Sequence, residues 1–282
     1  MIVYVNGELK TKEEAVVNVF DHGFLYGDGV FEGIRVYQQK IFRLEDHINR
    51  LYKSAHSIML KIPMDEQEMI RTVEDTVKAG GEENAYIRLV VSRGNGALGI
   101  DPGTCPKPNV VIIVGKIQLY PEENYARGIP LVTSSTRRLS FEGFDPQIKS
   151  LNYLNNISAK LEARQAGCME ALMLNKDGYI SECTADNIFF VSRGKLLTPS
   201  ASCGILKGIT RDTVIELARK RNIEVVEGLF TRFDAYTADE CFMTGTGAEI
   251  MPISAIDGRV LPASPGEMTK TLTGDFKALT RG

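Results

Sequence analysis

Short apolar runs and turn residues alternate at the start of the chain and predict β-structure. Val3 to Gly7 has valines at alternate positions followed by Asn-Gly, which predicts a short hairpin. Val16 to Phe20 predicts a second strand. Phe31 to Tyr37 predicts a third, which turns back at Gln38 to Lys40. The chain is therefore expected to open with a series of paired strands.

Two stretches then carry the apolar period of a helix. These are Leu44 to Ile58 and Asp65 to Ala79, the second with Asp65 as a plausible cap. The next apolar runs, Ala85 to Ser92 and Val110 to Gly115, are nearly continuous Val, Ile and Leu. That composition predicts strands that are buried on both faces or central in a sheet.

The second half continues with strands and helices. Ile129 to Ser134 predicts a strand, and Ala171 to Ser181 and Asn187 to Thr198 each predict a hairpin. Thr210 precedes a clear helical pattern and is predicted to be its N-cap. A last strand near Glu240 to Met243 runs into TGTGAEI, whose glycines permit a tight turn with exposed amides.

Length and composition are those of an ordinary globular protein. The 282 residues are enough for two modest domains, and 43% hydrophobic with 24% charged residues is typical. The polar stretch Leu119 to Gly128 is predicted to be an interdomain loop between a small domain, 1–118, and a larger one, 129–282. A net charge of -3 argues against a nucleic-acid surface.

The cysteines and histidines exclude several classes of site. The five cysteines are scattered without a C-x-x-C pair, which favours reduced thiols and a cytoplasmic location. The three histidines lack metal-ligand spacing, so no metal site is expected, and no G-x-S-x-G elbow appears. The start, MIVYVNGELK, has no signal-peptide pattern, and the apolar runs are too short to span a bilayer.

A lysine in the middle of the chain is the strongest candidate for chemistry. Lys149 follows the turn signal Asp145-Pro146 and opens a run that predicts a helix, with Tyr153 one turn further on the same face. A lysine beside an aromatic hydroxyl, with apolar neighbours that desolvate it, could form a Schiff base. The more common explanation of this pattern taken alone is a surface lysine at a helix start.

Three other charged positions are candidates for binding. Arg50 lies beside the apolar stripe of the first helix, where an arginine is usually a solvated flank. Tyr86 and Arg88 project from one face of their strand, so Arg88 is a candidate anion binder, with a structural ion pair as the alternative. Glu182 lies where a strand gives way to CTADN.

Two glycine-containing stretches could bind a ligand through the backbone. Gly208 to Thr210 leads a helix, and the free amides there form a ready phosphate site, with a simple capped helix as the alternative. Gly94 to Gly99, GNGALG, matches the dinucleotide pattern G-x-G-x-x-G. Pro106 and Pro108 forbid the helix that such a site requires, so this stretch predicts a loop.

Seven motifs follow one another along nearly the whole chain: YGDGVFEGIR, HINRL, AYIRL, IKSLNYL, GYISECTADNIF, LKGITRDTVIELA and MTGTGAEI. In this combination the sequence resembles the fold-type IV pyridoxal-phosphate enzymes, and most of all the branched-chain amino-acid aminotransferases. The resemblance implies a two-domain α+β or α/β fold. A small α/β domain would be followed by a larger one with a β-barrel-like sheet core and flanking helices.

The resemblance also implies a role for each cofactor-binding candidate. Lys149 would bind pyridoxal 5′-phosphate covalently and, once freed by the substrate amine, move the proton between Cα and C4′. Tyr153 would hydrogen-bond the phenolic oxygen, and Glu182 would pair with the pyridine nitrogen and keep it protonated. The other cofactor-binding residues implied, chiefly for the phosphate, are Arg50, Leu206, Ile209, Thr210 and Thr246.

For the substrate, the resemblance implies an apolar wall, an arginine for the distal carboxylate of glutamate, and a turn that binds the α-carboxylate. The corresponding residues are Phe31, Tyr86, Arg88, Thr246 and Gly247. The expected reaction moves the amino group of leucine, isoleucine or valine to 2-oxoglutarate by a ping-pong route. A homodimer or higher oligomer is also implied, with the active site at the domain boundary and partly completed by the partner's loop.

Other reactions remain open at this point. D-amino-acid aminotransferases carry an arginine and a histidine in the loop after AYIRL and a tyrosine in place of Phe31, whereas Arg93 is the only basic residue of that loop here. Branched-chain enzymes often have alanine where Gly247 stands, which leaves room for a broader substrate range. A lyase acting on aminodeoxychorismate would use the same lysine. A dehydrogenase would rest on GNGALG alone.

Overall fold

The computed structural model describes residues 1–117 and 120–282, which divide into two compact units. Unit 1 comprises Met1–Ile117 together with the short segment Ile148–Asn152. Among the described residues, unit 2 comprises 120–147 and Tyr153–Gly282. The segment that contains Lys149 is therefore part of unit 1, although its flanking residues belong to unit 2.

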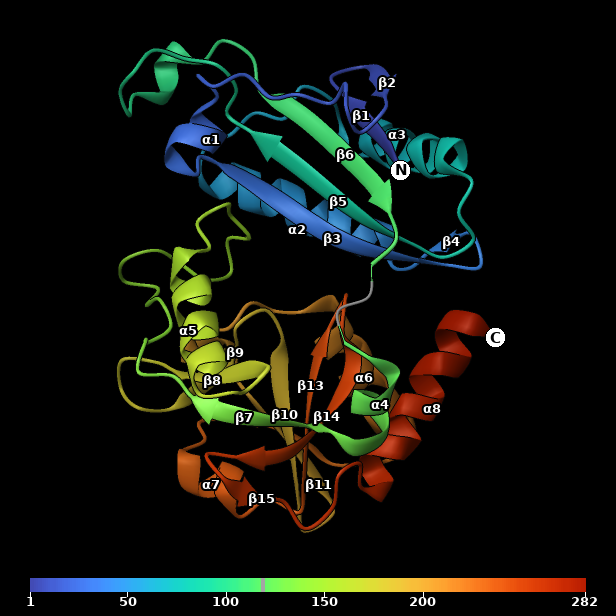
Figure 1. Cartoon of the computed structure of the whole chain (residues 1–282), viewed down its shortest axis with the longest axis vertical. Helices are drawn as coiled ribbons and strands as arrows, with labels where there is room; N and C mark the ends of the chain where they lie inside the picture. The colour runs from blue at the N-terminus through green and yellow to red at the C-terminus, as the bar shows by residue number, and fades with distance from the viewer. Residues whose placement is uncertain (118–119) are drawn as a thin grey trace. The chain divides into compact units, whose positions relative to one another are not determined.

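Unit 1 is built on a six-stranded antiparallel sheet in the order β2-β1-β6-β5-β3-β4 (Figure 1). Its strands are β1 (Ile2–Val5), β2 (Glu8–Lys10), β3 (Gly29–Tyr37), β4 (Lys40–Ile41), β5 (Ala85–Ser92) and β6 (Asn109–Gly115). Its helices are α1 (His22–Tyr26), α2 (Leu44–Ser57) and α3 (Glu66–Gly80), with the 3₁₀ turn Pro102–Thr104. The predicted hairpin, the strands β3, β5 and β6, and both long helices are confirmed.

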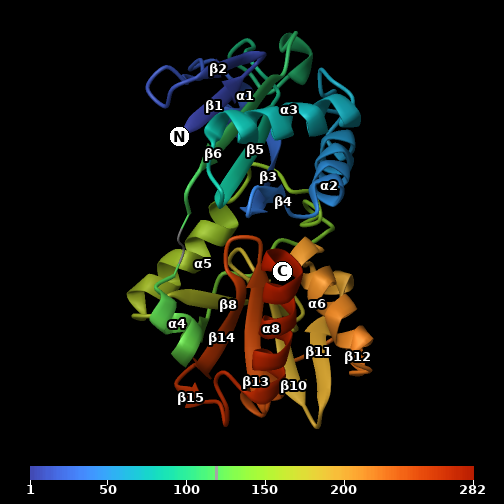
Figure 2. The same ribbon diagram turned by 90° about the vertical axis from the view of Figure 1, so that its right-hand side faces the viewer.

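The core of unit 1 lies between the sheet and the helices α2 and α3 (Figure 2). Ile48 and Leu51 of α2 and Val73 of α3 are fully buried against Ile87 and Ile112 of the sheet. Along β5 and β6 burial alternates from one residue to the next. Strands β6 and β5 are the two central strands of the sheet, which confirms the prediction that they are central in a sheet or buried on both faces. Only one of their faces is fully buried, because the two helices cover that face and the opposite face stays half-buried.

The predicted strand Val16 to Phe20 is also wrong. These residues form an irregular segment whose apolar side chains are exposed, and no strand of the described residues pairs with them. The β-branched residues alone predict a strand, but a strand needs a partner for its backbone groups.

Unit 2 is built on a nine-stranded mixed sheet that curls into a half-barrel, in the order β12-β11-β10-β13-β14-β7-β8-β9, with β15 paired to β14 (Figure 1). The strands from β7 to β11 are β7 (Ile129–Thr133), β8 (Glu170–Leu174), β9 (Ile180–Cys183), β10 (Asn187–Ser192) and β11 (Lys195–Pro199). The others are β12 (Val225–Gly228), β13 (Glu240–Gly245), β14 (Glu249–Ile256) and β15 (Arg259–Val260). Both predicted hairpins and the turn after β13 are confirmed.

Helices flank this sheet. They are α4 (Glu122–Arg127), α5 (Leu154–Gln165), α6 (Ile209–Lys220), α7 (Arg232–Tyr236) and α8 (Glu267–Arg281), and the 3₁₀ turn Ala201–Cys203 precedes α6. Helix α5 packs on β7 and β8, while α6 and α8 pack on each other and on β13 (Figure 2). Within the predicted interdomain loop 119–128, Leu119 lies outside the described residues and 122–127 form α4. The mixed architecture with a curled sheet core confirms the predicted fold class.

Candidate active site

Lys149 lies in an extended segment, Ile148–Asn152, that runs along β3. Phe31 N donates to Lys149 O at 3.0 Å, and Leu151 N donates to Gly29 O at 2.9 Å. An isolated antiparallel bridge joins the residues between these two pairs. The backbone of Lys149 is therefore fixed by the sheet of unit 1.

This arrangement corrects the prediction that Lys149 begins a helix. Helix α5 starts at Leu154, with Tyr153 as its N-cap residue, so Lys149 and Tyr153 do not share a helical face. The reason is non-local, because the backbone groups that a helix would need are bonded to β3 instead. Lys149 N also donates to Ser54 Oγ of α2 at 3.1 Å.

The glycines of YGDGVF make room for this segment. A Cβ on Gly29 would lie 2.7 Å from Leu151 Cδ1 and 2.7 Å from Val91 O, closer than real side chains approach. Gly27 has a φ of 71° and lies against the amide of Asn152, which donates to Gly27 O at 3.0 Å. Glycine at these positions lets the lysine-bearing segment pack closely on β3.

The half-buried face of the sheet in unit 1 brings four predicted site residues together. The Arg88 guanidinium lies 4.6 Å from the centre of the Phe31 ring and 5.4 Å from that of Tyr86. Lys149 Nζ lies 4.5 Å from the centre of the same Phe31 ring. A Cβ on Gly33 would collide with the Tyr86 hydroxyl, so the tyrosine ring extends over this glycine. Cations over aromatic faces are stabilised by the ring quadrupole.

Arg88 has no acidic partner within residues 1–117 and 120–282. Its contacts are the two aromatic rings, and no carboxylate of these residues forms an ion pair with it. The alternative of a structural ion pair is thus not supported. A half-buried guanidinium framed by aromatic rings is suited to bind an anion from outside the chain.

On the other face of β3, Arg50 is held by a buried carboxylate. Arg50 Nε and Nη2 donate to the two oxygens of Glu32 at 2.7 and 2.8 Å, and His47 Nδ1 lies 2.7 Å from Glu32 Oε2. Burial alone would raise the pKa of the Glu32 carboxyl, but Arg50 and His47 outweigh it and hold that pKa well below its usual range. Arg50 is therefore a fixed, partly buried group and not a solvated flank.

Burial also dominates the titration of His47. It lowers the pKa of the imidazole below the ordinary 6.5, although the neighbouring Glu32 acts in the opposite direction. The positive charges of Arg50 and Lys149 contribute to the lowering. His47 is consequently neutral at physiological pH.

Arg93, the basic residue of the loop after AYIRL, is fully engaged. Its Nε and Nη2 donate to the two oxygens of Asp28 at 2.9 Å. Nη1 donates to Met59 O and Nη2 to Ile58 O, both at 2.8 Å. This buried guanidinium has a structural role, so it does not supply the carboxylate trap of a D-amino-acid enzyme.

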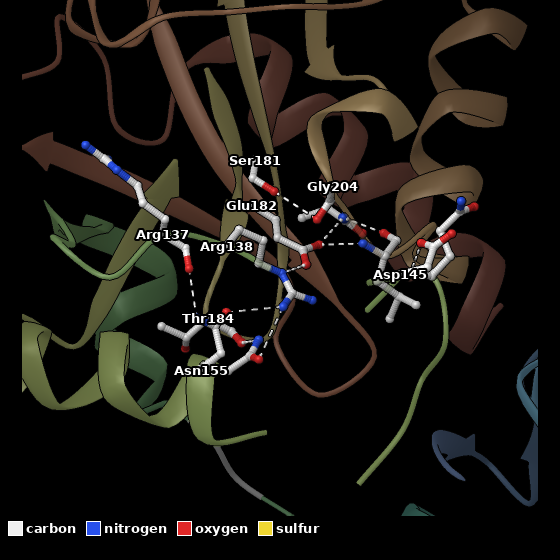
Figure 3. Close-up of polar contacts among 12 residues, drawn as sticks. Arg137, Arg138, Asp145, Asn155, Ser181, Glu182, Thr184 and Gly204 are labelled. Atoms are coloured by element: carbon white, nitrogen blue, oxygen red, sulfur yellow. Dashed lines mark hydrogen bonds and ion pairs between the residues drawn. The ribbon is translucent and has the colours of Figure 1, made fainter. Parts of the chain in front are cut away.

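In unit 2, three donors converge on the carboxylate of Glu182, which projects from β9 (Figure 3). Arg138 Nε donates to Oε1 at 2.8 Å, and Leu206 N and Asn187 Nδ2 donate to Oε2 at 3.0 Å each. The side chain is buried. Because an ionised carboxylate only accepts hydrogen bonds, these surroundings suit its charged form.

The loop before α6 is locked to the same cluster. Asn187 Nδ2 also donates to Leu206 O at 2.8 Å, and a Cβ on Gly208 would collide with Asn187 Oδ1. Gly208 is the N-cap of α6, so the predicted capping role of Thr210 is wrong. Ile209 and Thr210 are buried in the first turn, where the backbone amides have no partner within the helix.

The predicted turn Thr246-Gly247 lies between β13 and β14. Gly245 pairs with Glu249 at the end of the hairpin, and a Cβ on Gly245 would collide with Asp186 Oδ1. Thr246 and Gly247 are half-buried. The turn is thus placed by a close approach that only glycine permits.

Four residues of these clusters were not predicted from the sequence as site residues: Glu32, His47, Arg138 and Asn187. Arg138 meets Glu182 across 44 positions of sequence, and no local period marks it. Glu32 carried a signal, since a charged residue within the apolar strand of YGDGVFEGIR needs a partner when buried.

None of the helices formed by the described residues is both long and apolar enough to cross a membrane.

Comparison with known proteins gives a consistent result over nearly the whole chain. Residues 29–256 match the family described as amino-transferase class IV. A relative from Methanocaldococcus jannaschii, provisionally named a branched-chain-amino-acid aminotransferase, is 50% identical over 278 residues. That match covers 98% of this chain and 96% of the relative.

Solved structures are similar as well. The crystal structure of the Escherichia coli branched-chain amino acid aminotransferase has a TM-score of 0.97 at 34% identity, covering 100% of this chain and 95% of that one. A second branched-chain amino acid aminotransferase, solved in complex with N-(5′-phosphopyridoxyl)-L-glutamate and abbreviated T.th. for its source, has a TM-score of 0.92 at 35% identity. Here 99% of this chain and 94% of the other are covered.

Proposed function

This chain belongs to the class IV aminotransferase family, and from that premise we propose that it transaminates branched-chain L-amino acids with pyridoxal phosphate as cofactor. It is an aminotransferase whose relatives are named for branched-chain substrates. The acceptor we propose is 2-oxoglutarate, in a ping-pong reaction. The complex of the T.th. enzyme, which joins a phosphopyridoxyl group to L-glutamate, supports this choice.

The observation that carries the substrate proposal is the face of the first sheet on which Phe31, Tyr86 and Arg88 lie together. A ping-pong aminotransferase must accept an aliphatic side chain in one half-reaction and a carboxylate in the other. The aromatic rings offer an apolar wall, and Arg88 offers one cation without an acidic partner among the described residues. An aliphatic group would pack on the rings, and the distal carboxylate of glutamate would pair with the guanidinium.

Transamination of D-amino acids is the closest alternative, and two features argue against it. Phe31 stands where a tyrosine is expected in D-specific enzymes. Arg93 is occupied by Asp28 and two backbone carbonyls, so it is not available to bind an α-carboxylate. The turn amides at Thr246-Gly247 and the Tyr86 hydroxyl are the groups we propose instead.

The residues present fit the cofactor. When bound, pyridoxal phosphate supplies a ring that accepts the electron pair released as the bond to the substrate Cα breaks. Lys149 would hold the cofactor and then carry the proton that leaves Cα. Glu182, fixed by three donors, would pair with the ring nitrogen, and Tyr153 would hydrogen-bond the phenolic oxygen.

The phosphate would be bound by charge and by backbone amides. Arg50 would supply the charge, with its guanidinium oriented by Glu32. The first turn of α6 would supply the amides of Ile209 and Thr210. We assign Leu206 and Thr246 to the same group of cofactor contacts, through their backbone or hydroxyl groups.

The test is a spectral half-reaction. Purified protein loaded with pyridoxal phosphate is mixed separately with L-leucine, L-glutamate, D-alanine and D-glutamate, and the visible absorbance is followed. We expect the two L-amino acids alone to convert the absorbance to that of pyridoxamine phosphate. Conversion by the D-amino acids would contradict the substrate proposal.

A variant tests the proposed role of the lysine in the same assay. Lys149→Ala should fold, yet retain no cofactor after borohydride reduction, because the amine that binds it is gone. Its activity should fall at least about 10³-fold. Undiminished labelling would place the covalent attachment at another lysine.

We also propose that the protein is a cytoplasmic homodimer. Phe24 of α1 and Leu98 and Ile100 of the loop between β5 and β6 are 73%, 75% and 84% exposed in the single chain. Backbone hydrogen bonds link the two segments, from Gly96 N to Phe20 O and from His22 N to Gly94 O. A second copy of the chain would cover this apolar surface.

A further inference from the structure

Arg138 is a buried arginine whose side chain points at Glu182 (Figure 3). We propose that Arg138 is a positioning residue that acts through Glu182 to set the proton affinity of the cofactor ring. The inference rests on the proposed function, in which Glu182 pairs with the ring nitrogen. Arg138 touches the carboxylate and would not itself touch the cofactor.

The geometry separates Arg138 from the other two donors. Leu206 N and Asn187 Nδ2 are neutral and share Oε2 of Glu182, whereas Arg138 brings a full positive charge to Oε1 at 2.8 Å. The neutral donors orient the carboxylate. The arginine in addition offsets part of its negative charge.

The guanidinium is itself held in place from helix α5. Arg138 Nη1 lies 3.5 Å from Asn155 Oδ1 and 3.4 Å from Asn156 Oδ1. Asn156 Nδ2 in turn donates to Thr184 O at 2.6 Å, two residues beyond Glu182. The arginine is therefore clamped between α5 and the chain that follows β9, so its distance from Glu182 is fixed.

Its neighbour Arg137 provides a contrast. Arg137 is exposed, and its side chain points away from Glu182 (Figure 3). Its backbone carbonyl accepts a hydrogen bond from Asn155 Nδ2 at 2.8 Å. The two arginines thus carry the same charge at adjacent positions, but one alone is directed at the carboxylate.

Three other titratable groups lie near this strand, and none of them forms a hydrogen bond or ion pair with Arg138 in the contacts described above. Burial raises the pKa of the Cys183 thiol well above its ordinary value, so this neighbour is neutral. Glu170 is paired with Lys160 at 2.8 Å. Asp186, across the turn from Glu182, is a further acid whose negative charge acts on Cys183.

A cation beside a carboxylate lowers the proton affinity of any group that the carboxylate in turn stabilises. With Arg138 present, a ring nitrogen paired with Glu182 should release its proton at a lower pH than with a lone carboxylate. Replacing Arg138 by a neutral residue should therefore move the titration of the bound cofactor to higher pH.

The experiment is a pH titration of bound pyridoxal phosphate labelled with nitrogen-15 in its ring, in which the chemical shift of the ring nitrogen reports its protonation. We expect the midpoint of Arg138→Gln to rise by about one pH unit, and that of Arg138→Lys, which keeps the charge, to stay near the wild-type value. Arg137→Gln is the matched control and should leave the midpoint unchanged. An unchanged midpoint in folded Arg138→Gln, or an equal rise in Arg137→Gln, would overturn the inference.

Removing one partner of a buried ion pair can also unfold a protein, so Glu182→Gln and the double variant complete the experiment. If Arg138 acts through Glu182, adding Arg138→Gln to Glu182→Gln should leave the midpoint of the Glu182 variant unchanged. A further shift in that background would show that the arginine acts by another route. Wild-type protein without any bound chromophore would instead overturn the proposed function.

Discussion

At the scale of single residues, the four arginines described above differ in whether a carboxylate or an aromatic ring lies against the guanidinium. Arg50, Arg93 and Arg138 each form a short ion pair with a carboxylate. Arg88 lies instead against the rings of Phe31 and Tyr86. Its charge is therefore available for a ligand, whereas Arg93 and Arg138 are paired inside the fold and Arg50 is oriented by Glu32.

Truncating Arg88 should separate the two kinds of substrate. In Arg88→Ala, the reaction of L-glutamate and of 2-oxoglutarate should lose about 2–4 kcal/mol of transition-state stabilisation, seen as a lower kcat/KM. The kcat/KM for L-leucine should fall far less. Steady-state kinetics with each substrate measure the difference. Arg71→Ala, on the exposed side of α3, is the control and should change neither. Equal losses for leucine and glutamate would make Arg88 a structural residue.

His47 should make the protein less stable in mild acid. Its pKa is lowered in the folded state, so the unfolded chain binds the proton more readily and stability falls as the pH drops below about 6.5. The loss should approach about 1.4 kcal/mol per pH unit at most. Chemical denaturation at about pH 7.5 and about pH 5.5 measures the free energy of unfolding at each pH. Between these two values His47→Gln should lose less of that free energy than the wild type.

The matched control for this prediction is His56→Gln, because His56 is exposed on the same helix. It should retain the pH dependence of the wild type. If the free energy of unfolding changed with pH by the same amount in all three proteins, His47 would not contribute to the acid sensitivity.

At the scale of elements, the start of α6 depends on the side chain of Asn187. That amide links Glu182 to Leu206 O and occupies the space where a Cβ on Gly208 would stand. The loop and the helix start are therefore placed by one side chain on β10. A change at the start of α6 should consequently alter the hydrogen bonding of Glu182.

Gly208→Ala should displace Asn187 and break its two hydrogen bonds. We expect a loss of about 1–3 kcal/mol in the free energy of unfolding, with weaker cofactor binding measured by titration of the apoenzyme. Gly274→Ala is the control, because a Cβ there meets nothing within 4 Å in helix α8. That variant should be stabilised by about 0.5–1 kcal/mol. If Gly208→Ala left the free energy of unfolding and cofactor binding unchanged, Asn187 would be able to move without cost.

The elements also show what the sequence could predict. Helices α2 and α3 follow helical periods of apolar residues, and α3 also has Asp65 as its cap. Strands β3 and β5 follow apolar runs, so the positions of all four elements could be inferred from short stretches. The extended conformation of Lys149 could not, because it depends on hydrogen bonds to Phe31 and Gly29 more than a hundred positions away. Arg138 was missed for the same reason, whereas the motif resemblance supplied Lys149 and Glu182 as candidates without their partners.

At the scale of the whole molecule, the exposed apolar surface around Phe24 and Leu98 is the basis for expecting a dimer. Phe24→Asp with Leu98→Asp should give a monomer in light-scattering measurements, since two charges would be buried in the interface. Val260→Asp, at an 82% exposed position of β15, is the control and should remain dimeric. A wild-type protein that is monomeric at all concentrations would contradict the dimer proposal.

The pairing of Ile148–Asn152 with β3 has a consequence for synthesis on the ribosome. Unit 1 takes most of its chain from the N-terminal part, but this last segment is made only after the first part of unit 2. Domains generally fold in order as they emerge. Here the sheet of unit 1 stays incomplete, with the backbone groups of Gly29 and Phe31 in β3 unpaired by this segment, until Asn152 has left the exit tunnel. Docking of the segment that contains Lys149 would then be the late step that completes the first unit.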